Sequence, residues 1–237
     1  MLLYFQESIQ STHRLRYIGA EITSSLLLLS QTAHNMATHG TGRRGRAQVW
    51  SKLGPSGKQN KMFCKPIDRI RKLACIFGDS QLRGVVQEAV PLPTHPRWQF
   101  IVSSTPGGTC GHIELEFKSF VFPCRPDLIV VEAGTNNLRQ PVEEAEMEFR
   151  HLLRIARKTC EVVAISILPR LDGLGYVVPS FNAAFQRSAR EEGASWVDLT
   201  DRFPVQELRL WAYDGVHLSD CTGMPRLTAA VAEVCSQ

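Results

Sequence analysis

Four short polar clusters in this sequence contain the residue types that acyl transfer requires. The candidate nucleophile is Ser80, the last residue of a Gly-Asp-Ser tripeptide. A serine hydroxyl is a weak nucleophile until a neighbouring base removes its proton. His217 is the candidate base, and Asp214, three residues earlier, can hold the imidazole in the required tautomer. These residue types therefore predict a catalytic triad of Ser80, Asp214 and His217.

The other two clusters offer hydrogen-bond donors. The tetrahedral intermediate of acyl transfer carries an oxyanion, which suitably placed donors stabilise. Gly107 and Gly108 belong to one cluster, where glycine lets the backbone approach a substrate closely. Asn136, in the string Gly-Thr-Asn-Asn, adds a side-chain amide. We expect an oxyanion hole made by the backbone N–H groups of Ser80 and Gly107, with Gly108 as the alternative to Gly107, and by the amide of Asn136.

Strands and helices must bring these clusters together. Apolar runs predict five buried strands at Leu73–Phe77, Trp98–Ser103, Asp127–Ala133, Glu161–Leu168 and Ser195–Leu199. Helical patterns occupy Gln81–Val90, Pro141–Lys158, Ser180–Glu192 and Thr222–Val234. Such alternation predicts an α/β fold with a parallel sheet covered on both faces. Each cluster follows a predicted strand, and ligands of such sheets bind beyond the carboxyl ends of the strands.

The same clusters resemble the four sequence blocks of the SGNH, or GDSL, hydrolases. Ile76–Ser80, a glycine after the second strand, Gly134–Asn136 and Asp214–His217 occur in that family's order. The resemblance covers roughly residues 73–237. It implies a flavodoxin-like three-layer αβα sandwich with a five-stranded parallel sheet of order 2-1-3-4-5. It also implies a serine esterase that hydrolyses a small carboxylic ester, such as an acetyl ester, through an acyl-serine intermediate without a metal or other cofactor.

One departure and one alternative accompany this resemblance. Asn137 stands where many members of the family have aspartate, although the GTNN string also occurs in the platelet-activating-factor acetylhydrolase branch. The strings GDSQLRG, STPGGT and LWAYDGVHLSD are similar to esterase domains of vertebrate retroelement-derived proteins. The alternative is an SGNH-like module that binds RNA or protein without catalysis, since a fold does not fix a function. Its signature is a lost triad residue, and none is lost here, so the sequence favours the esterase.

Two acidic residues near the predicted strand ends have competing interpretations. Asp198 ends the last strand and could be mistaken for the triad acid, but a turn or cap residue is favoured. Glu132 interrupts an apolar strand just before the Gly-Thr-Asn-Asn string. It either points toward the site or pairs with Arg83, which lies one turn after Ser80 on the same helix face. A structural ion pair or a solvated position is the favoured interpretation of Glu132.

The charge of the chain is unevenly distributed. Residues 1–72 carry 12 Lys and Arg against 3 Asp and Glu, whereas the remaining residues carry 15 against 20. A Gly-, Ser-, Lys- and Arg-rich stretch in the first part cannot bury enough apolar surface to fold. We therefore predict a basic, largely disordered arm over residues 1–70 and an SGNH-hydrolase-like domain over 71–237. The arm around Arg43–Arg46 either contacts nucleic-acid phosphates or, as we favour, is simply solvated.

Cysteine usage and hydropathy bear on the compartment. Seven cysteines are scattered without a CxxC pair, which argues against a zinc site, and buried free thiols favour a reducing compartment. Fully apolar runs such as Leu26–Leu29 are far below the roughly 20 residues that span a bilayer. The N-terminus also lacks the features of a secretory signal. We expect an intracellular, cytoplasmic protein without a membrane span, whose partner is a small-molecule ester.

Overall fold

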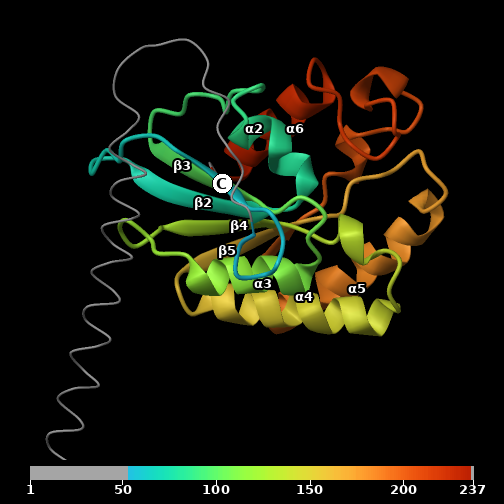
Figure 1. Cartoon of the computed structure of the whole chain (residues 1–237), viewed down its shortest axis with the longest axis horizontal. Helices are drawn as coiled ribbons and strands as arrows, with labels where there is room; N and C mark the ends of the chain where they lie inside the picture. The colour runs from blue at the N-terminus through green and yellow to red at the C-terminus, as the bar shows by residue number, and fades with distance from the viewer. Residues whose placement is uncertain (1–52, 236–237) are drawn as a thin grey trace, which may run out of the picture. The chain divides into compact units, whose positions relative to one another are not determined.

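The computed structural model describes residues 53–235, in which a six-stranded sheet carries helices on both faces (Figure 1). The strands are β1 (Lys61–Cys64), β2 (Lys72–Gly78), β3 (Trp98–Ser104), β4 (Leu128–Glu132), β5 (Glu161–Ile165) and β6 (Ser195–Val197). The α-helices are α2 (Arg83–Val86), α3 (Cys110–Ser119), α4 (Val142–Arg157), α5 (Val178–Glu191) and α6 (Gly223–Val234).

The strand order is β1-β3-β2-β4-β5-β6. Strands β2 to β6 are all parallel, and they follow the predicted order 2-1-3-4-5. The expected flavodoxin-like α/β sandwich is therefore confirmed. The count of five strands is one too few, because β1 adds an antiparallel edge strand beside β3.

Strand β1 also corrects the expected boundary between arm and domain. Lys61 pairs with Ser104 and Cys64 with Ile101, so residues 61–64 belong to the sheet. A boundary at residue 70 is therefore too late. Strand β1 was not predicted from the sequence, because its four residues lie among Lys, Gly and Pro, where composition predicts no strand. Residues 1–52, which include the arginines considered for nucleic-acid contact, lie outside the residues that the structure describes.

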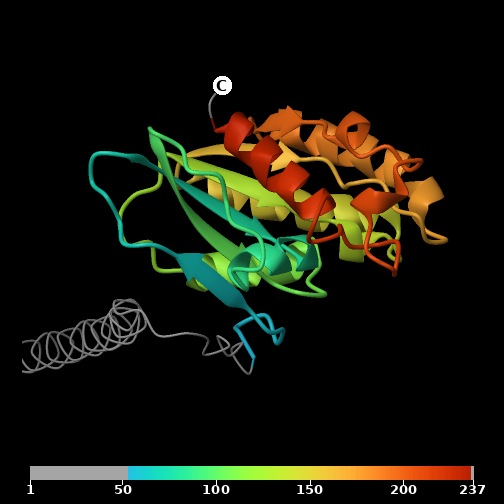
Figure 2. The ribbon, with the colours of Figure 1, turned by 90° about the horizontal axis from the view of Figure 1, so that it is seen from above.

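Strand β2 shows how the core positions the site. Successive side chains of a strand point to opposite faces. Leu73, Cys75 and Phe77 pack toward α3, α4 and α5, whereas Ala74 and Ile76 pack toward α2 and α6. Figure 1 shows these helices on opposite sides of the sheet, and in Figure 2 the red helix α6 lies over it. Because both faces are covered, the polar residues after β2 emerge only at the sheet's carboxyl edge.

Helix α4 anchors one of the two layers. The apolar stripe predicted for Pro141–Lys158 is buried, and it consists of Ala145, Phe149, Leu152, Leu153 and Ala156. Phe149 stacks on Phe185 of α5 with ring centroids 4.0 Å apart. Burial of each large side chain contributes roughly 1.5–3 kcal/mol. This packing fixes α4 rigidly beneath the site, to which it contributes a carboxylate.

Two helices differ from expectation. Helix α3 was not predicted, although Thr109 forms a capping box with His112 and the buried Ile113 and Phe117 are spaced by one turn. Helix α2 ends well before the predicted Val90, because the backbone N–H groups of residues 89 and 90 both turn back to the carbonyl of Gly84. Within residues 53–235, none of the helices has the length and apolarity needed to cross a membrane.

Candidate active site

The turn after β2 presents Ser80 at the carboxyl edge of the sheet. Gly78 ends the strand, and a Cβ atom at this position would lie 2.5 Å from the carbonyl oxygen of Glu132, so a larger residue does not fit. Asp79 is fully buried, and its Oδ1 accepts the N–H of Gln81 at 3.0 Å. This bond caps the short 3₁₀ helix η1 (Ser80–Leu82), which holds Ser80 in a partly exposed position.

The three predicted triad residues lie in one hydrogen-bonded chain. His217 Nε2 is 2.9 Å from Ser80 Oγ, and His217 Nδ1 is 2.5 Å from Asp214 Oδ2. Asp214 Oδ1 also accepts the backbone N–H groups of Val216 and His217, each at 2.9 Å. Burial would raise the pKa of Asp214, but the hydrogen bonds from His217 and Val216 lower this pKa to about 2. Asp214 is therefore ionised at neutral pH and fixes the ring with Nε2 facing Ser80.

A closed loop and two hydrogen bonds made by the side chain of Gln81 position His217. The loop is closed by a bridge between the buried residues Trp211 and Leu218. Gln81 Nε2 donates to the carbonyl of Val216 at 2.8 Å, and the N–H of Leu218 donates to Gln81 Oε1 at 3.3 Å. The amide of Gln81 thus holds both neighbours of His217. The sequence did not reveal this role, because nothing local indicates that Gln81 reaches residues about 135 positions away.

The predicted oxyanion donors also gather at this edge. Within the described residues, the N–H groups of Ser80 and Gly107 form no backbone hydrogen bond, whereas the N–H of Gly108 donates to Thr105 O at 2.9 Å. Gly107, with φ +68°, is therefore the available donor of the two glycines. Asn136 Nδ2 donates to Gly108 O at 3.0 Å, which brings the amide to the same turn and leaves its second N–H for another acceptor.

Asn137 joins the two loops that carry the predicted oxyanion donors to the core, a role that the sequence did not reveal. It is fully buried in the 3₁₀ helix η2 (Thr135–Asn137). Its Oδ1 accepts the N–H of Cys110 at 3.0 Å, and its Nδ2 donates to Gln140 Oε1 at 2.7 Å and to Glu148 Oε2 at 2.9 Å. An aspartate could accept but could not donate these two bonds. The asparagine at this position, where many family members have aspartate, therefore suits the two acceptors, Gln140 and Glu148, that surround it.

Glu148 of α4 completes this network. Its Oε2 accepts the N–H of Gly111 at 2.9 Å at the start of α3. Burial would raise the pKa of Glu148, but hydrogen bonds from Gly111, Thr109, Asn137 and Gln140 lower it. The ionised carboxylate therefore ties the first turn of α3 to η2. It fixes both the glycine turn and Asn136.

Arg170 connects a third loop to the site. Its side chain is only 8% exposed. Its Nη1 donates to the carbonyl of Thr135 at 3.0 Å, while Nε and Nη2 donate to the two carboxylate oxygens of Asp172 at 2.9 and 2.6 Å. The bidentate pair neutralises the Arg170 charge. Arg170 thus holds η2 without presenting an unpaired cation.

Glu132 does not occupy either of the positions favoured from the sequence. It is 1% exposed, it forms no ion pair with Arg83 in the described part of the chain, and Arg83 is exposed. Glu132 Oε2 and Asp79 Oδ2 are both buried without a hydrogen-bond partner. Burial, with the Asp79 charge added, raises the pKa of Glu132, and burial also raises that of Asp79. Two such carboxyls cannot both ionise cheaply, so the pair retains a proton near neutral pH.

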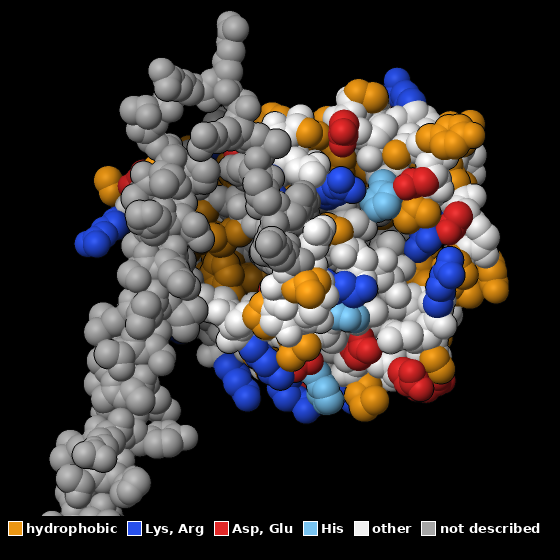
Figure 3. Space-filling view, in the orientation of Figure 1, with side chains coloured by type: hydrophobic (Ala, Val, Ile, Leu, Met, Phe, Trp, Pro, Cys, Tyr) orange, Lys and Arg blue, Asp and Glu red, His pale blue; other side chains and the backbone are white. Residues whose placement is uncertain are grey.

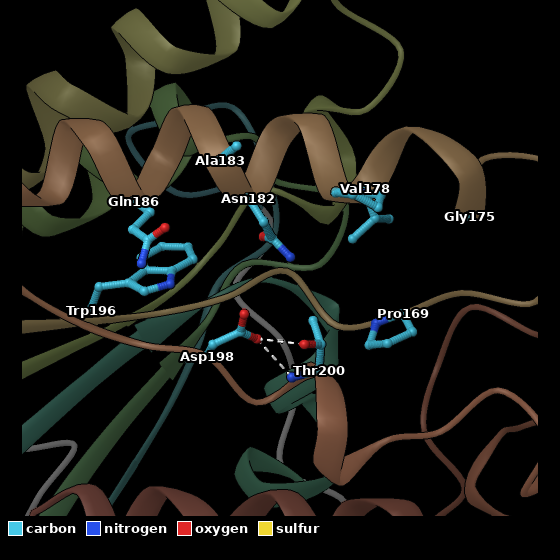
Figure 4. A pocket seen from close by; sticks show the side chains of 10 residues that line it. Pro169, Gly175, Val178, Asn182, Ala183, Gln186, Trp196, Asp198 and Thr200 are labelled. Atoms are coloured by element: carbon cyan, nitrogen blue, oxygen red, sulfur yellow. Dashed lines mark hydrogen bonds between the residues drawn. The ribbon is translucent and has the colours of Figure 1, made fainter.

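A separate hollow of about 380 Å³ lies between α5 and the end of β6 (Figure 4). Val178 and Trp196 contribute apolar walls to it. Asp198 also lines it, and its Oδ1 accepts the N–H and hydroxyl of Thr200 at 2.8 and 2.7 Å. Asp198 is therefore a turn residue, as predicted. None of the triad residues lines this hollow, so the chemistry lies elsewhere.

Comparison with solved structures gives several matches to the fold. An acetyl xylan esterase, AlAXEase, is 15% identical over 68% of this chain and 98% of its own, with a TM-score of 0.59. The esterase EstA from Pseudoalteromonas sp. is 17% identical over 70% of this chain and 100% of its own, with a TM-score of 0.58. A lipolytic G-D-S-L protein from Veillonella parvula is 16% identical over 70% and 99%, with a TM-score of 0.58.

At these identities the structural matches show the fold alone. A comparison with curated protein sequences gives no match. The model of the GDSL-like lipase/acylhydrolase family, however, matches residues 76–220, which is more than half of the chain. This range includes Ser80, the oxyanion loops, Asp214 and His217. The chain therefore belongs to the GDSL-like lipase/acylhydrolase family and is an SGNH-type serine hydrolase.

Proposed function

We propose that this chain hydrolyses a small carboxylic ester through an acyl-serine intermediate. The observation that supports this proposal is the continuous chain from Ser80 Oγ through His217 to Asp214. Ser80 is the nucleophile, His217 the general base and acid, and Asp214 the residue that orients the imidazole. The N–H groups of Ser80 and Gly107 and the amide of Asn136 form the oxyanion hole.

The reaction proceeds in two stages. Ser80 Oγ attacks the ester carbonyl carbon while its proton passes to His217 Nε2, and the oxyanion accepts bonds from the three donors. The bond to the alcohol oxygen then breaks, and His217 gives its proton to the leaving alcohol. Water attacks the acyl-serine as His217 takes one of its protons. The acid leaves when the bond to Ser80 breaks and His217 returns the proton to Ser80 Oγ.

The small size of the acyl group follows from what surrounds Ser80. Helix α2 has only four residues, and the segment from it to β3 contains no helix or strand. Few residues therefore remain to build a deep acyl tunnel between β2 and β3. An acetyl ester fits such a site, and one structural neighbour is an acetyl xylan esterase.

The test combines a covalent probe with a turnover assay. The full chain is treated with a fluorescent fluorophosphonate and is assayed with 4-nitrophenyl acetate, alongside Ser80→Ala and Ser180→Ala. Ser180 is an exposed serine of α5 whose hydroxyl donates to Val177 O, away from His217. We expect labelling and hydrolysis by the wild type and by Ser180→Ala, and neither by Ser80→Ala.

Circular dichroism establishes that each variant is folded. A folded wild-type protein that neither reacts with the probe nor hydrolyses the ester would contradict the proposal. It would favour instead a non-catalytic binding module on the same fold. Hydrolysis that persists in Ser80→Ala would show that a different group carries the reaction.

A further inference from the structure

The turn that precedes β1 is fixed to helix α3. The N–H of Gly54 donates to Lys58 O at 2.6 Å and closes the turn. The N–H and hydroxyl of Ser56 both donate to Glu116 Oε1, at 3.0 and 2.5 Å, and Glu116 is only 7% exposed. The N–H of Lys58 donates back to Ser56 Oγ at 3.1 Å. A buried carboxylate of α3 therefore determines where the Lys58 side chain begins.

The residues after this turn are tied to the strand that leads into the glycine loop. Asn60 Nδ2 donates to Thr105 Oγ1 at 2.9 Å and to Ser103 Oγ at 3.0 Å. Lys61 then pairs with Ser104 in the sheet. The segment 54–64 is thus held at both ends against β3 and α3. These are the two elements that flank Gly107.

The Lys58 side chain reaches across to the glycine loop. Its Nζ lies 4.0 Å from the position that a Cβ atom on Gly107 would occupy, and no other neighbour comes as close to that position. The ammonium group therefore lies beside the residue whose N–H we assign to the oxyanion hole. Lys58 as a whole residue is partly exposed, so it packs against the domain and is still accessible to a bound substrate.

Among the residues that the structure describes, no carboxylate forms an ion pair with Lys58. The ion pairs among residues 53–235 involve other cations, including Arg170 with Asp172, and none includes Lys58. On the described part of the face in Figure 3, blue and red side chains are interspersed. The electrostatic potentials of interspersed positive and negative side chains largely cancel at a distance. Selection of a charged substrate therefore depends on an unpaired charge close to the site.

The side of the site on which Lys58 lies indicates which part of the ester it meets. His217 must reach the oxygen of the leaving alcohol, so the alcohol occupies the His217 side. The carbonyl oxygen faces the oxyanion donors, so the acyl chain takes the remaining direction, away from His217, and we place it on the side of Gly107. Resting on the proposed esterase function, we propose that Lys58 is a specificity-determining residue that binds an anionic group on the acyl chain. The substrate class is a half-ester of a short dicarboxylic acid.

The test compares esters that differ only in acyl charge. Mono-4-nitrophenyl glutarate is the anionic substrate, and 4-nitrophenyl valerate is a neutral partner of similar length. We expect Lys58→Gln to lower kcat/KM for the glutarate ester about 5- to 10-fold and to change the valerate value less than about twofold. Lys58→Glu should lower the glutarate value further. Added NaCl should reduce the wild-type preference, because salt screens a partly exposed charge.

Lys65→Gln is the matched control, since Lys65 is an exposed lysine at the other end of β1 and gives the same change in net charge. It should leave the ratio of the two kcat/KM values unchanged. A Lys58→Gln variant with the wild-type ratio would overturn this inference while leaving the esterase intact. If instead the folded wild type hydrolyses neither ester and does not react with a fluorophosphonate, the proposed function itself fails.

A second pair of substrates tests the assigned side. 4-Acetoxybenzenesulfonate and phenyl acetate share an acetyl group and differ in the charge of the alcohol. We expect Lys58→Gln to change the ratio of their kcat/KM values by less than about twofold relative to the ratio measured for the control Lys65→Gln. A larger effect on this pair than on the glutarate pair would refute contact with the acyl chain.

Discussion

The two halves of the site are held in different ways. The oxyanion half, which consists of Gly107 and Asn136 with their supports Asn137 and Glu148, is tied to three elements by hydrogen bonds that are buried or partly buried. The base half is the Asp214–His217 loop, where the two side chains are 50% and 41% exposed and bond to each other across three residues. The oxyanion half is thus part of the folded core, whereas the base half depends on local geometry. Substitutions should therefore affect stability in the first and activity alone in the second.

The largest effect is expected in the base half. His217→Ala removes the proposed general base, and we expect kcat/KM for 4-nitrophenyl acetate to fall about 10⁴- to 10⁶-fold. The free energy of unfolding should change by less than about 0.5 kcal/mol, because the ring is half-exposed. Ester hydrolysis and urea denaturation measure the two quantities.

His151→Ala is the matched control, since His151 is an exposed histidine on α4. It should leave both kcat/KM and the free energy of unfolding unchanged. A loss of more than about 2 kcal/mol in His217→Ala would contradict the comparison. It would show that the base half also belongs to the core.

The next effect is expected in the oxyanion half. Asn137→Ala leaves the buried Cys110 N–H without its partner and removes one of the bonds to Glu148, and a buried unsatisfied donor costs about 1–3 kcal/mol. We expect a loss of about 2–4 kcal/mol in the free energy of unfolding. Because Asn136 is the adjacent residue, kcat should fall in the same variant while the protein is still folded.

Asn137→Asp separates shape from hydrogen-bond donation. The carboxylate keeps an acceptor for Cys110 but faces the Glu148 carboxylate, so the variant should be at least as unstable as Asn137→Ala. Urea denaturation at neutral pH compares the three proteins. A variant of either kind with wild-type stability would place the oxyanion half outside the core.

Gln81 links the turn that carries Ser80 to the base half. Gln81→Leu preserves approximate volume but removes the bonds to Val216 and Leu218, which flank His217. We expect kcat/KM to fall about 10- to 100-fold, since a small displacement of a catalytic group has a large effect on rate. The rate of fluorophosphonate labelling should fall in parallel, because both reactions need His217 aligned with Ser80.

Gln81→Glu keeps an acceptor for the Leu218 N–H but removes the donor to Val216 O. It should recover part of the labelling rate that Gln81→Leu loses. Equal labelling rates in the wild type and the two Gln81 variants would show that the loop positions His217 without the hydrogen bonds of Gln81.

Local pattern sufficed for Asp214 and His217 and for the positions of the parallel strands, whereas the strand order 2-1-3-4-5 followed from the resemblance to the SGNH hydrolases. Asp214 and His217 contact each other across three residues, and the apolar runs of β2 to β6 are continuous in the sequence. The supports of the oxyanion half could not be predicted, because they depend on pairs distant in sequence. Cys110 meets Asn137 across 27 residues and Gly111 meets Glu148 across 37. Glu132 was misjudged because its environment is set by Asp79, which only the register of β2 and β4 brings close.

The smallest effect is expected for Glu132, which is buried at the end of β4. This residue should make the free energy of unfolding depend on pH, whereas Asp214 in the base half should not do so above about pH 5. Because burial raises the pKa of Glu132, the folded state binds more protons than the unfolded chain above about pH 4, and the free energy of unfolding falls as pH rises. Glu132→Gln replaces the protonated carboxyl with a neutral amide and removes this dependence. Urea denaturation should show no gain near pH 4 and a gain of about 1–2 kcal/mol at pH 7. Asp214 has its pKa lowered to about 2, so it affects the slope only below about pH 5, where the unfolded chain begins to bind its proton, and it does so equally in both proteins. A variant that is less stable than the wild type at every pH would show that Glu132 is ionised and required in that form.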